Sequence, residues 1–439
     1  MVNLLRKKEI SSTELTKLFI KQIERVNPDL NAIVKINESV LAEAKEKDEN
    51  FSELNKKRPL YGLPITIKDS INTADIITTG GTEGRKNYLP KNDATVVKRL
   101  KKAGAIILGK TNTPELTLEY ETNNKIYGKT NNPYDINKSP GGSSGGAAAA
   151  VAAGCSPLDI GSDTAGSIRL PAHFCGICGL KGSKGRVPTT GSIVPNGIGI
   201  VNDLTQIGPL SKYVDDLDYV MKIIAGPDGK DPGIPPVDYP DSRLIKNNEL
   251  KAIYYLDNGI YEVDTDIKES VLKTVDFVRD KGIQIEKVKP PGLNKTFSLF
   301  KRIFSADGWN WKYRLLKKYN TINEVKEKPE KALNGIEFNK LLGEWQKFKA
   351  EILKFMTNYD FVISPVTAFA AREHGFSYDK DIIAAFSYTM LYNLLGWPAL
   401  SMRVSETKDK LPIGVQIAAA PWREDICLSL AKDIEKEFG

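Results

Sequence analysis

Histidine is scarce in this chain: His173 and His374 are the only two among 439 residues. Histidine is the commonest general base for activating a serine nucleophile. The glycine-rich stretch at 141–145 formally fits the G-x-S-x-G nucleophile elbow of α/β-hydrolases, and it would need His374 as its base. Ser144 fits the same pattern one step on, so the match is partly a product of glycine density. His173 is better interpreted as a structural residue at a helix start, so a different base has to be considered.

Cysteine is also sparse, with four residues in the whole chain. Cys175 and Cys178 form a C-x-x-C, but no second pair exists and the flanking residues are apolar. We interpret them as small buried hydrophobic residues and expect neither a metal nor a cofactor. So few cysteines suit a reducing cytoplasm.

Long hydrophobic runs are missing, and none approaches the ~20 residues that a membrane span needs. The N-terminal segment lacks the apolar core of a secretory signal. Lys and Arg (62) exceed Asp and Glu (55) only slightly, and the lysines are scattered. This pattern favours a solvated surface over a nucleic-acid stripe. We therefore expect a soluble cytoplasmic protein without membrane association.

What the chain does have is a glycine- and serine-rich stretch at residues 140–188. Two serine-bearing glycine loops, at 141–146 and 161–167, flank an alanine-rich helix and a short apolar strand. Glycine permits unusual backbone dihedrals and close approach to a ligand. Such runs are often flexible linkers. Here the alanine helix and the apolar neighbours favour a packed site of backbone amides and hydroxyls.

Lysine is the alternative base, provided that burial lowers its pKa enough to leave it neutral. Lys68 follows the apolar strand 65–67 and is the best candidate, although it could instead pair with Asp69 or extend outward. The residues alone therefore lead to a serine/lysine hydrolase. The backbone amides of Thr164 to Ser167 would form its oxyanion hole.

The fold class follows from short buried strands that alternate with helices, as at 105–108 and 361–365. We predict an α/β protein with a three-layer α/β/α architecture around a large mixed, mostly parallel central sheet. We expect a single domain over 1–439, with a variable helical region at about 240–355 that shapes the substrate pocket. Aromatic residues cluster at 297–313; they could line an apolar pocket, but ordinary core is the more common role.

The two glycine loops resemble the signature of the amidase signature family. The resemblance extends over most of the chain and is weakest at about 240–355. The matching segments outside the loops are Pro64 to Asp69, Gly179-Leu180-Lys181, Gly185-Arg186-Val187-Pro188 and Leu411 to Gln416. This resemblance implies a hydrolase of carboxylic amides, with an amide small molecule as partner and with homodimer formation as an option.

The resemblance also implies roles for particular residues. Ser167 corresponds to the nucleophile, Ser143 to the bridging serine after a cis peptide, and Lys68 to the base. The implied oxyanion hole consists of the main-chain N–H groups of Thr164, Ala165, Gly166 and Ser167. Gly142, Ser144, Asp163 and Arg169 are expected to support the loops. Ala165 stands where many members have glycine, and Lys181-Gly182-Ser183 replaces a more common Lys-Pro-Thr.

Two alternatives from other functional classes stay open. The first is the tRNA-dependent amidotransferase component of the same family, the glutamyl-tRNA amidotransferase, in which case nucleic acid would be a partner. Leu170 differs from the glutamine associated with that component. The second is a non-catalytic binding homologue, against which the presence of Lys68, Ser143 and Ser167 argues.

Overall fold

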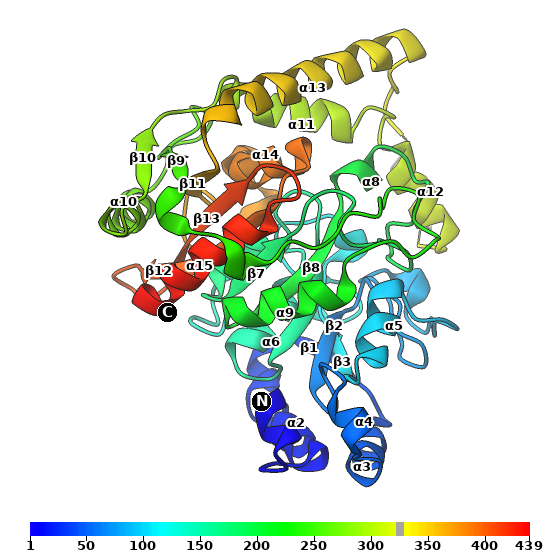
Figure 1. Ribbon diagram of the computed structural model, residues 1–439. Helices are drawn as coiled ribbons and strands as arrows, with labels where there is room; N and C mark the ends of the chain where they lie inside the picture. Colours follow the sequence, from blue (N-terminus) through cyan, green and yellow to red (C-terminus); the bar gives the residue numbers. More distant parts are fainter. Residues whose placement is uncertain (322–328) are drawn as a thin grey trace.

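The central element is one large sheet that draws strands from nearly the whole chain (Figure 1). The computed structural model describes residues 1–321 and 329–439; the helical prediction at 290–355 therefore includes residues 322–328, which lie outside the described part. Within the described ranges, eleven strands pair in the order β1 (Ile33–Ile36), β3 (Ile106–Thr111), β2 (Pro64–Lys68), β6 (Leu158–Asp163), β8 (Gln206–Ser211), β7 (Cys178–Lys181), β12 (Ala399–Glu406), β13 (Pro412–Ala419), β11 (Phe361–Pro365), β9 (Lys251–Tyr254) and β10 (Gln284–Lys287). A separate hairpin joins β4 (Asn123–Asn124) and β5 (Gly128–Lys129).

The sheet is mixed, as expected, but the prediction that it is mostly parallel is wrong. In the part of the chain that the structure describes, the parallel pairs are β2–β3, β2–β6, β9–β10 and β9–β11. The other six neighbouring pairs run antiparallel. Short links explain the difference, because the few residues between β12 and β13 can only return the chain antiparallel. Alternating strand and helix patterns in the sequence do not reveal these returns.

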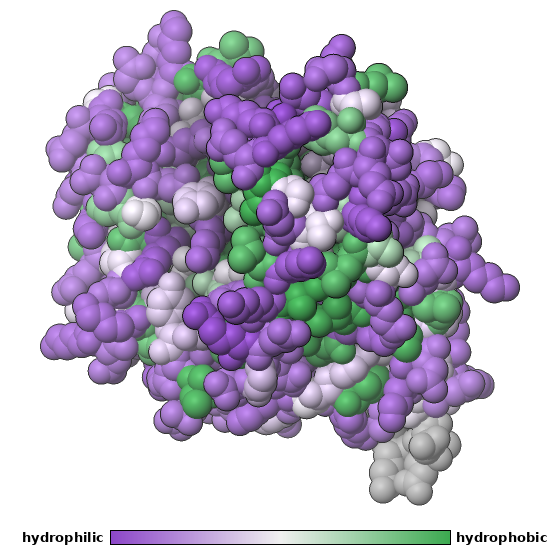
Figure 2. All heavy atoms as spheres, turned by 90° about the horizontal axis from the view of Figure 1, so that it is seen from below, coloured by the Kyte–Doolittle hydropathy of each residue, from purple (hydrophilic) through white to green (hydrophobic). Residues whose placement is uncertain are grey.

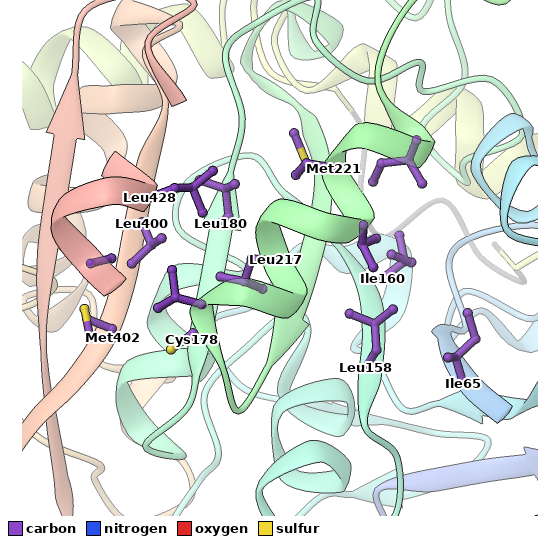
Figure 3. Close-up of a cluster of buried hydrophobic side chains, with 14 of the residues drawn as sticks. Ile65, Leu158, Ile160, Cys178, Leu180, Leu217, Met221, Leu400, Met402 and Leu428 are labelled. Carbon is purple, nitrogen blue, oxygen red and sulfur yellow. The ribbon is translucent and has the colours of Figure 1, made fainter. Parts of the chain in front are cut away.

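Helices cover both faces of the sheet, which gives the expected three-layer arrangement (Figure 1). The described helices are α1 (Val2–Arg6), α2 (Ser12–Leu30), α3 (Val40–Glu49), α4 (Glu53–Lys56), α5 (Thr95–Lys102), α6 (Gly145–Ala152), α7 (Arg169–Phe174), α8 (Val201–Leu204), α9 (Val214–Ile224), α10 (Thr265–Asp280), α11 (Thr296–Phe304), α12 (Asn310–Lys318), α13 (Gly335–Phe355), α14 (Ser387–Leu395) and α15 (Glu424–Phe438). Helix α9 packs on one face, where side chains such as Leu158, Ile160 and Leu217 form an apolar layer (Figure 3). Helices α6 and α7 pack against β6, β12 and β13. The candidate site lies between α6 and the sheet.

Local sequence signals explain several of the helix boundaries. Ser11 caps α2 in a capping box with Glu14, as the sequence indicated. Asn334 and Glu337 form the same arrangement at α13. Residues 251–254 and 284–287 add β9 and β10 to the sheet, so the region 240–355 is only partly helical. No helix among residues 1–321 and 329–439 is long and apolar enough to cross a membrane.

Two hollows on the molecule have to be distinguished. The larger has a volume of about 550 Å³ and lies among α1, α2 and the start of α9; it contains neither Lys68 nor Ser167. On the face seen from below, apolar residues gather in the middle and polar residues surround them (Figure 2). The second hollow, of about 300 Å³, is lined by Ser167, Thr164 and Ala165. The smaller hollow is therefore the candidate active site.

Candidate active site

Lys68 is the last residue of β2 and is fully buried. Its Nζ lies 2.7 Å from Ser143 Oγ, 2.9 Å from Ser144 Oγ and 3.1 Å from Ser162 Oγ. A neutral amine donates two hydrogen bonds and accepts one, so three hydroxyl partners suit it without a counter-ion. Burial lowers the pKa of Lys68 to about 7, against the charges of Asp163 and Asp159. The structure thus brings the predicted base to the predicted bridging serine.

The first glycine loop is packed tightly, which excludes the linker interpretation. The Gly142–Ser143 peptide is cis, as the family resemblance implied. A Cβ on Gly142 would lie 2.6 Å from Glu121 O, and one on Gly146 would lie 2.3 Å from Asn112 N. Such distances are too short for any side chain, so only glycine allows these backbones to approach one another.

The second glycine loop carries Ser167 from the end of β6 to α7. Ser167 is 6% exposed, and its carbonyl oxygen accepts a 3.1 Å hydrogen bond from Ser144 N. Gly166 has φ of 119°, and a Cβ there would lie 2.4 Å from Thr389 Oγ1. The two glycine loops are therefore in direct contact. Among the described residues, no hydrogen bond joins the hydroxyls of Ser143 and Ser167.

Asp163 organises the backbone of this second loop. Its Oδ1 accepts from Gly166 N at 2.9 Å, and its Oδ2 accepts from Ile168 N at 3.1 Å. Burial opposes ionisation, but the Arg169 guanidinium, with Nη2 2.8 Å from Oδ1, holds the pKa of the Asp163 carboxyl below its usual range. Because the Gly166 N–H is engaged by Asp163, the N–H groups of Thr164, Ala165 and Ser167 are the ones left to face the cavity.

Arg169 links this loop to the C-terminal part of the sheet. Its guanidinium donates to Gln416 Oε1 at 2.7 Å and to Asn393 Oδ1 at 2.6 Å, and the whole side chain is buried. Asn393 Nδ2 in turn donates to Asp163 O and Oδ1. The side chain of Arg169 therefore acts inside the protein rather than at the cavity surface.

We expect Arg169→Leu to destabilise the protein by roughly 3–5 kcal/mol, because it leaves the buried Asp163 carboxylate without its cation. Urea unfolding would measure the loss. Arg302→Leu is the matched control, since it breaks an exposed pair with Glu344 that should contribute about 1 kcal/mol or less. Equal losses in the two variants would contradict this role for Arg169.

The two histidines have positions that exclude them as the base. His173 is buried; its Nδ1 accepts from Gly414 N at 2.7 Å and its Nε2 lies 3.0 Å from Phe369 O. His374 Nδ1 lies 3.6 Å from Glu121 Oε2. In the described parts of the chain, neither ring forms a hydrogen bond with Ser143, Ser144 or Ser167. The structural interpretation of His173 is thus confirmed.

Several site residues were not singled out from the sequence. Ser162 contacts Lys68, and its position inside the second glycine loop was the only available signal. Asn393 and Gln416 reach Arg169 from more than 220 positions away, a relation that no local pattern indicates. Lys110 and Lys181 are also buried, and burial lowers their pKa values to about 8 and about 7. No group of three or more His, Cys, Asp or Glu side chains in the described ranges could hold a metal ion.

The walls of the cavity are mainly aromatic and aliphatic. Phe304 lies 5.5 Å from Phe300, 5.3 Å from Trp309 and 5.4 Å from Trp311 between ring centroids, and all four line the cavity with Ser167. The sequence interpretation gave core packing the greater weight. The structure assigns these rings both roles, because Trp311 is also buried in a hydrophobic cluster.

Known proteins match this chain along nearly its whole length. The family model described as Amidase matches residues 14–428. The A-type component of the glutamyl-tRNA(Gln) amidotransferase of Sulfurihydrogenibium sp. is 32% identical over 98% of this chain and 94% of its own. Fatty-acid amide hydrolase 2 of Homo sapiens is also 32% identical, over 100% of this chain and 88% of its own. The structure of 6-aminohexanoate cyclic dimer hydrolase superposes with a TM-score of 0.88 at 25% identity, covering 100% of this chain and 96% of that chain.

The fold and the comparisons together define an enzyme that acts on the C–N bond of amides. The chain belongs to the amidase family.

Proposed function

We propose that this chain cleaves a carboxylic amide through an acyl-enzyme on Ser167, with Ser143 and Lys68 relaying the proton. The observation that carries the proposal is the buried Lys68 amine, 2.7 Å from Ser143 Oγ and without a carboxylate in ion-pair contact within the described residues. A neutral amine at this place can accept a proton from a serine hydroxyl. Its pKa of about 7 leaves about half of the amines neutral at neutral pH.

In the proposed reaction, Ser167 Oγ attacks the amide carbonyl carbon and gives its proton to Ser143 Oγ, which passes its own proton to Lys68 Nζ. The tetrahedral oxyanion accepts hydrogen bonds from the main-chain N–H groups of Thr164, Ala165 and Ser167. The relay then runs backwards and protonates the leaving nitrogen as the C–N bond breaks. Water attacks the acyl-enzyme by the same route and releases the acid.

The cavity favours an amide with an apolar acyl or aryl group. Its lining includes Phe297, Phe300, Phe304 and Trp309 close to the Ser167 end. Burial of apolar substrate surface against such rings contributes roughly 25 cal/mol per Å². On this basis the chain would work as a free-standing amidase.

The second candidate is the A-type component of a glutamyl-tRNA(Gln) amidotransferase. Several relatives of that name match 98–100% of this chain at 31–33% identity. These relatives support this alternative more directly than the free-standing enzyme. The identity itself does not separate the two, since a fatty-acid amide hydrolase matches equally well. Under this candidate the substrate would be glutamine, and the chain would act with other subunits and a tRNA.

The decisive assay compares glutamine with aryl and long-chain amides on the purified chain alone. Hydrolysis of the apolar amides without a partner supports the free-standing amidase. Glutamine hydrolysis that appears only with co-purified subunits supports the amidotransferase. If neither the chain alone nor its co-purified complex released acid from any amide, the proposal would be overturned.

We expect Phe304→Ala to lower kcat/KM for a long-chain or aryl amide by about 10-fold or more, because it removes apolar surface from the cavity wall. Acetamide should be hardly affected, because it does not reach the ring. Phe355→Ala is the control, since that ring packs on Tyr359 away from the cavity lining. Equal losses for long and short amides would contradict the substrate assignment.

A further inference from the structure

Asp159 is a fully buried carboxylate that the proposed reaction does not use. Its Oδ2 accepts a 3.0 Å hydrogen bond from Thr111 Oγ1. Its Oδ1 has no hydrogen-bond partner among the described residues, and the same part of the chain offers it no ion pair. A buried charged group without a counter-ion is costly, so its presence needs a reason.

The strand register places Asp159 on the same face of the sheet as Lys68. Asp159 pairs with Thr66, two residues before Lys68 on β2, and Thr111 pairs with Lys68 itself. Side chains alternate along a strand, and register partners in neighbouring strands share a face. Leu158, Ile160 and Ile65 lie toward α9 (Figure 3), so Asp159 and Lys68 project from the opposite face.

Helix α6 contacts β2, β3 and β6, and its residues Gly145–Ala152 include no charged side chain. The groups that face Asp159 are therefore Thr66 and Lys68 on β2 and Thr111 on β3, with Lys110 as the neighbouring cation. Lys110 Nζ is occupied by Thr73 Oγ1 at 2.8 Å and by Ile71 O.

We infer that Asp159 is a positioning residue for Lys68: held by Thr111 on the same sheet face, its carboxyl group sets the charge against which the Lys68 amine gains and loses its proton. The inference rests on the proposed role of Lys68 as the base. Two carboxylates act on this amine, Asp163 and Asp159. The charge of Asp163 is balanced by the ion pair with Arg169, whereas Asp159 has no such partner in the described residues. Asp159 is therefore the anion that remains to act on Lys68.

The protonation of Asp159 is itself sensitive to this neighbourhood. Burial raises its pKa to about 7, against the nearby hydroxyls of Thr66 and Thr111 and the charges of Lys110 and Lys68. Lys68 and Asp159 thus change charge in the same pH range. An ionised Asp159 favours the ammonium form of Lys68, and a neutral Asp159 favours the amine.

Asp159→Asn tests the inference through the pH profile of kcat/KM. Removing the negative charge lowers the pKa of Lys68, so the neutral base persists to lower pH. We expect the acid limb to move toward lower pH by roughly 0.5–1.5 units. A purely structural role would lower kcat or stability and leave the position of the limb unchanged, which would overturn the inference.

Thr111→Val is the second variant, for the case that Asp159→Asn fails to fold. It removes the hydroxyl that stabilises the carboxylate, keeps the volume, and should shift the limb in the same direction by less. Asp218→Asn is the control, since Asp218 is a buried aspartate on α9 that pairs with Lys432. Its limb should stay at the wild-type position.

A direct titration separates this inference from the proposed function. In Ser167→Ala, NMR of ε-13C-labelled lysine reports the pKa of Lys68, whose signal is identified by its loss in a Lys68→Met derivative. Adding Asp159→Asn should lower that pKa whether or not the wild-type protein hydrolyses amides. An unchanged pKa would refute the role of Asp159, and absent hydrolysis with a lowered pKa would refute only the proposed function.

Discussion

Ser167→Ala should lower kcat/KM for amide hydrolysis by at least about 1,000-fold, because the variant lacks the oxygen that forms the acyl-enzyme. The loop should keep its shape, since its contacts run through other atoms. Ser144 N donates to the carbonyl oxygen of residue 167, and Asp163 holds Gly166 N and Ile168 N. Steady-state kinetics and labelling with a fluorophosphonate probe would measure the loss.

The control for Ser167→Ala is Ser183→Ala, which also removes a buried serine hydroxyl. Ser183 Oγ accepts from Trp422 N at 2.8 Å, on a part of the chain that does not line the cavity. Its loss should reduce stability by about 1 kcal/mol and leave labelling intact. Full activity in Ser167→Ala would contradict the acyl-enzyme, whatever the control shows.

The candidate catalytic residues could be found from the sequence because they lie in short, unusual patterns. Ser143 and Ser167 stand in glycine loops, and Lys68 follows an apolar strand, where a lysine is out of place. The scarcity of histidine directed attention to that lysine. Their convergence was implied by the family resemblance, and the 2.7 Å contact between Lys68 and Ser143 agrees with it.

The residues that support the site could not be found in this way. Arg169 was expected to support the loop, but its partners Asn393 and Gln416 come from α14 and β13. Their contact exists only because the sheet brings distant segments together. The same limit explains the wrong proportion of parallel strands. Strand direction depends on how the chain returns to the sheet, and hydrophobic periodicity carries no information about that return.

Lys68→Arg should lower kcat/KM by roughly 100- to 10,000-fold at every pH, because a guanidinium stays charged and cannot accept the serine proton. In the wild type, burial lowers the pKa of Lys68 to about 7. The neutral amine is then the main form above that pH, and the ammonium is the main form below it. The rate should therefore fall about tenfold for each pH unit on the acid side, as expected for loss of a single base.

The acid limb alone does not identify the lysine, because Lys110 and Lys181 also have pKa values lowered by burial to about 8 and about 7. Lys110→Met and Lys181→Met are therefore the matched controls. Lys110 binds Thr73 Oγ1 and Lys181 binds Gly182 O, so neither is placed to receive a proton from Ser143. Both variants should retain the acid limb even if they are less stable. A limb that disappears in either of them, or a wild-type rate that stays flat down to about pH 5, would contradict Lys68 as the base.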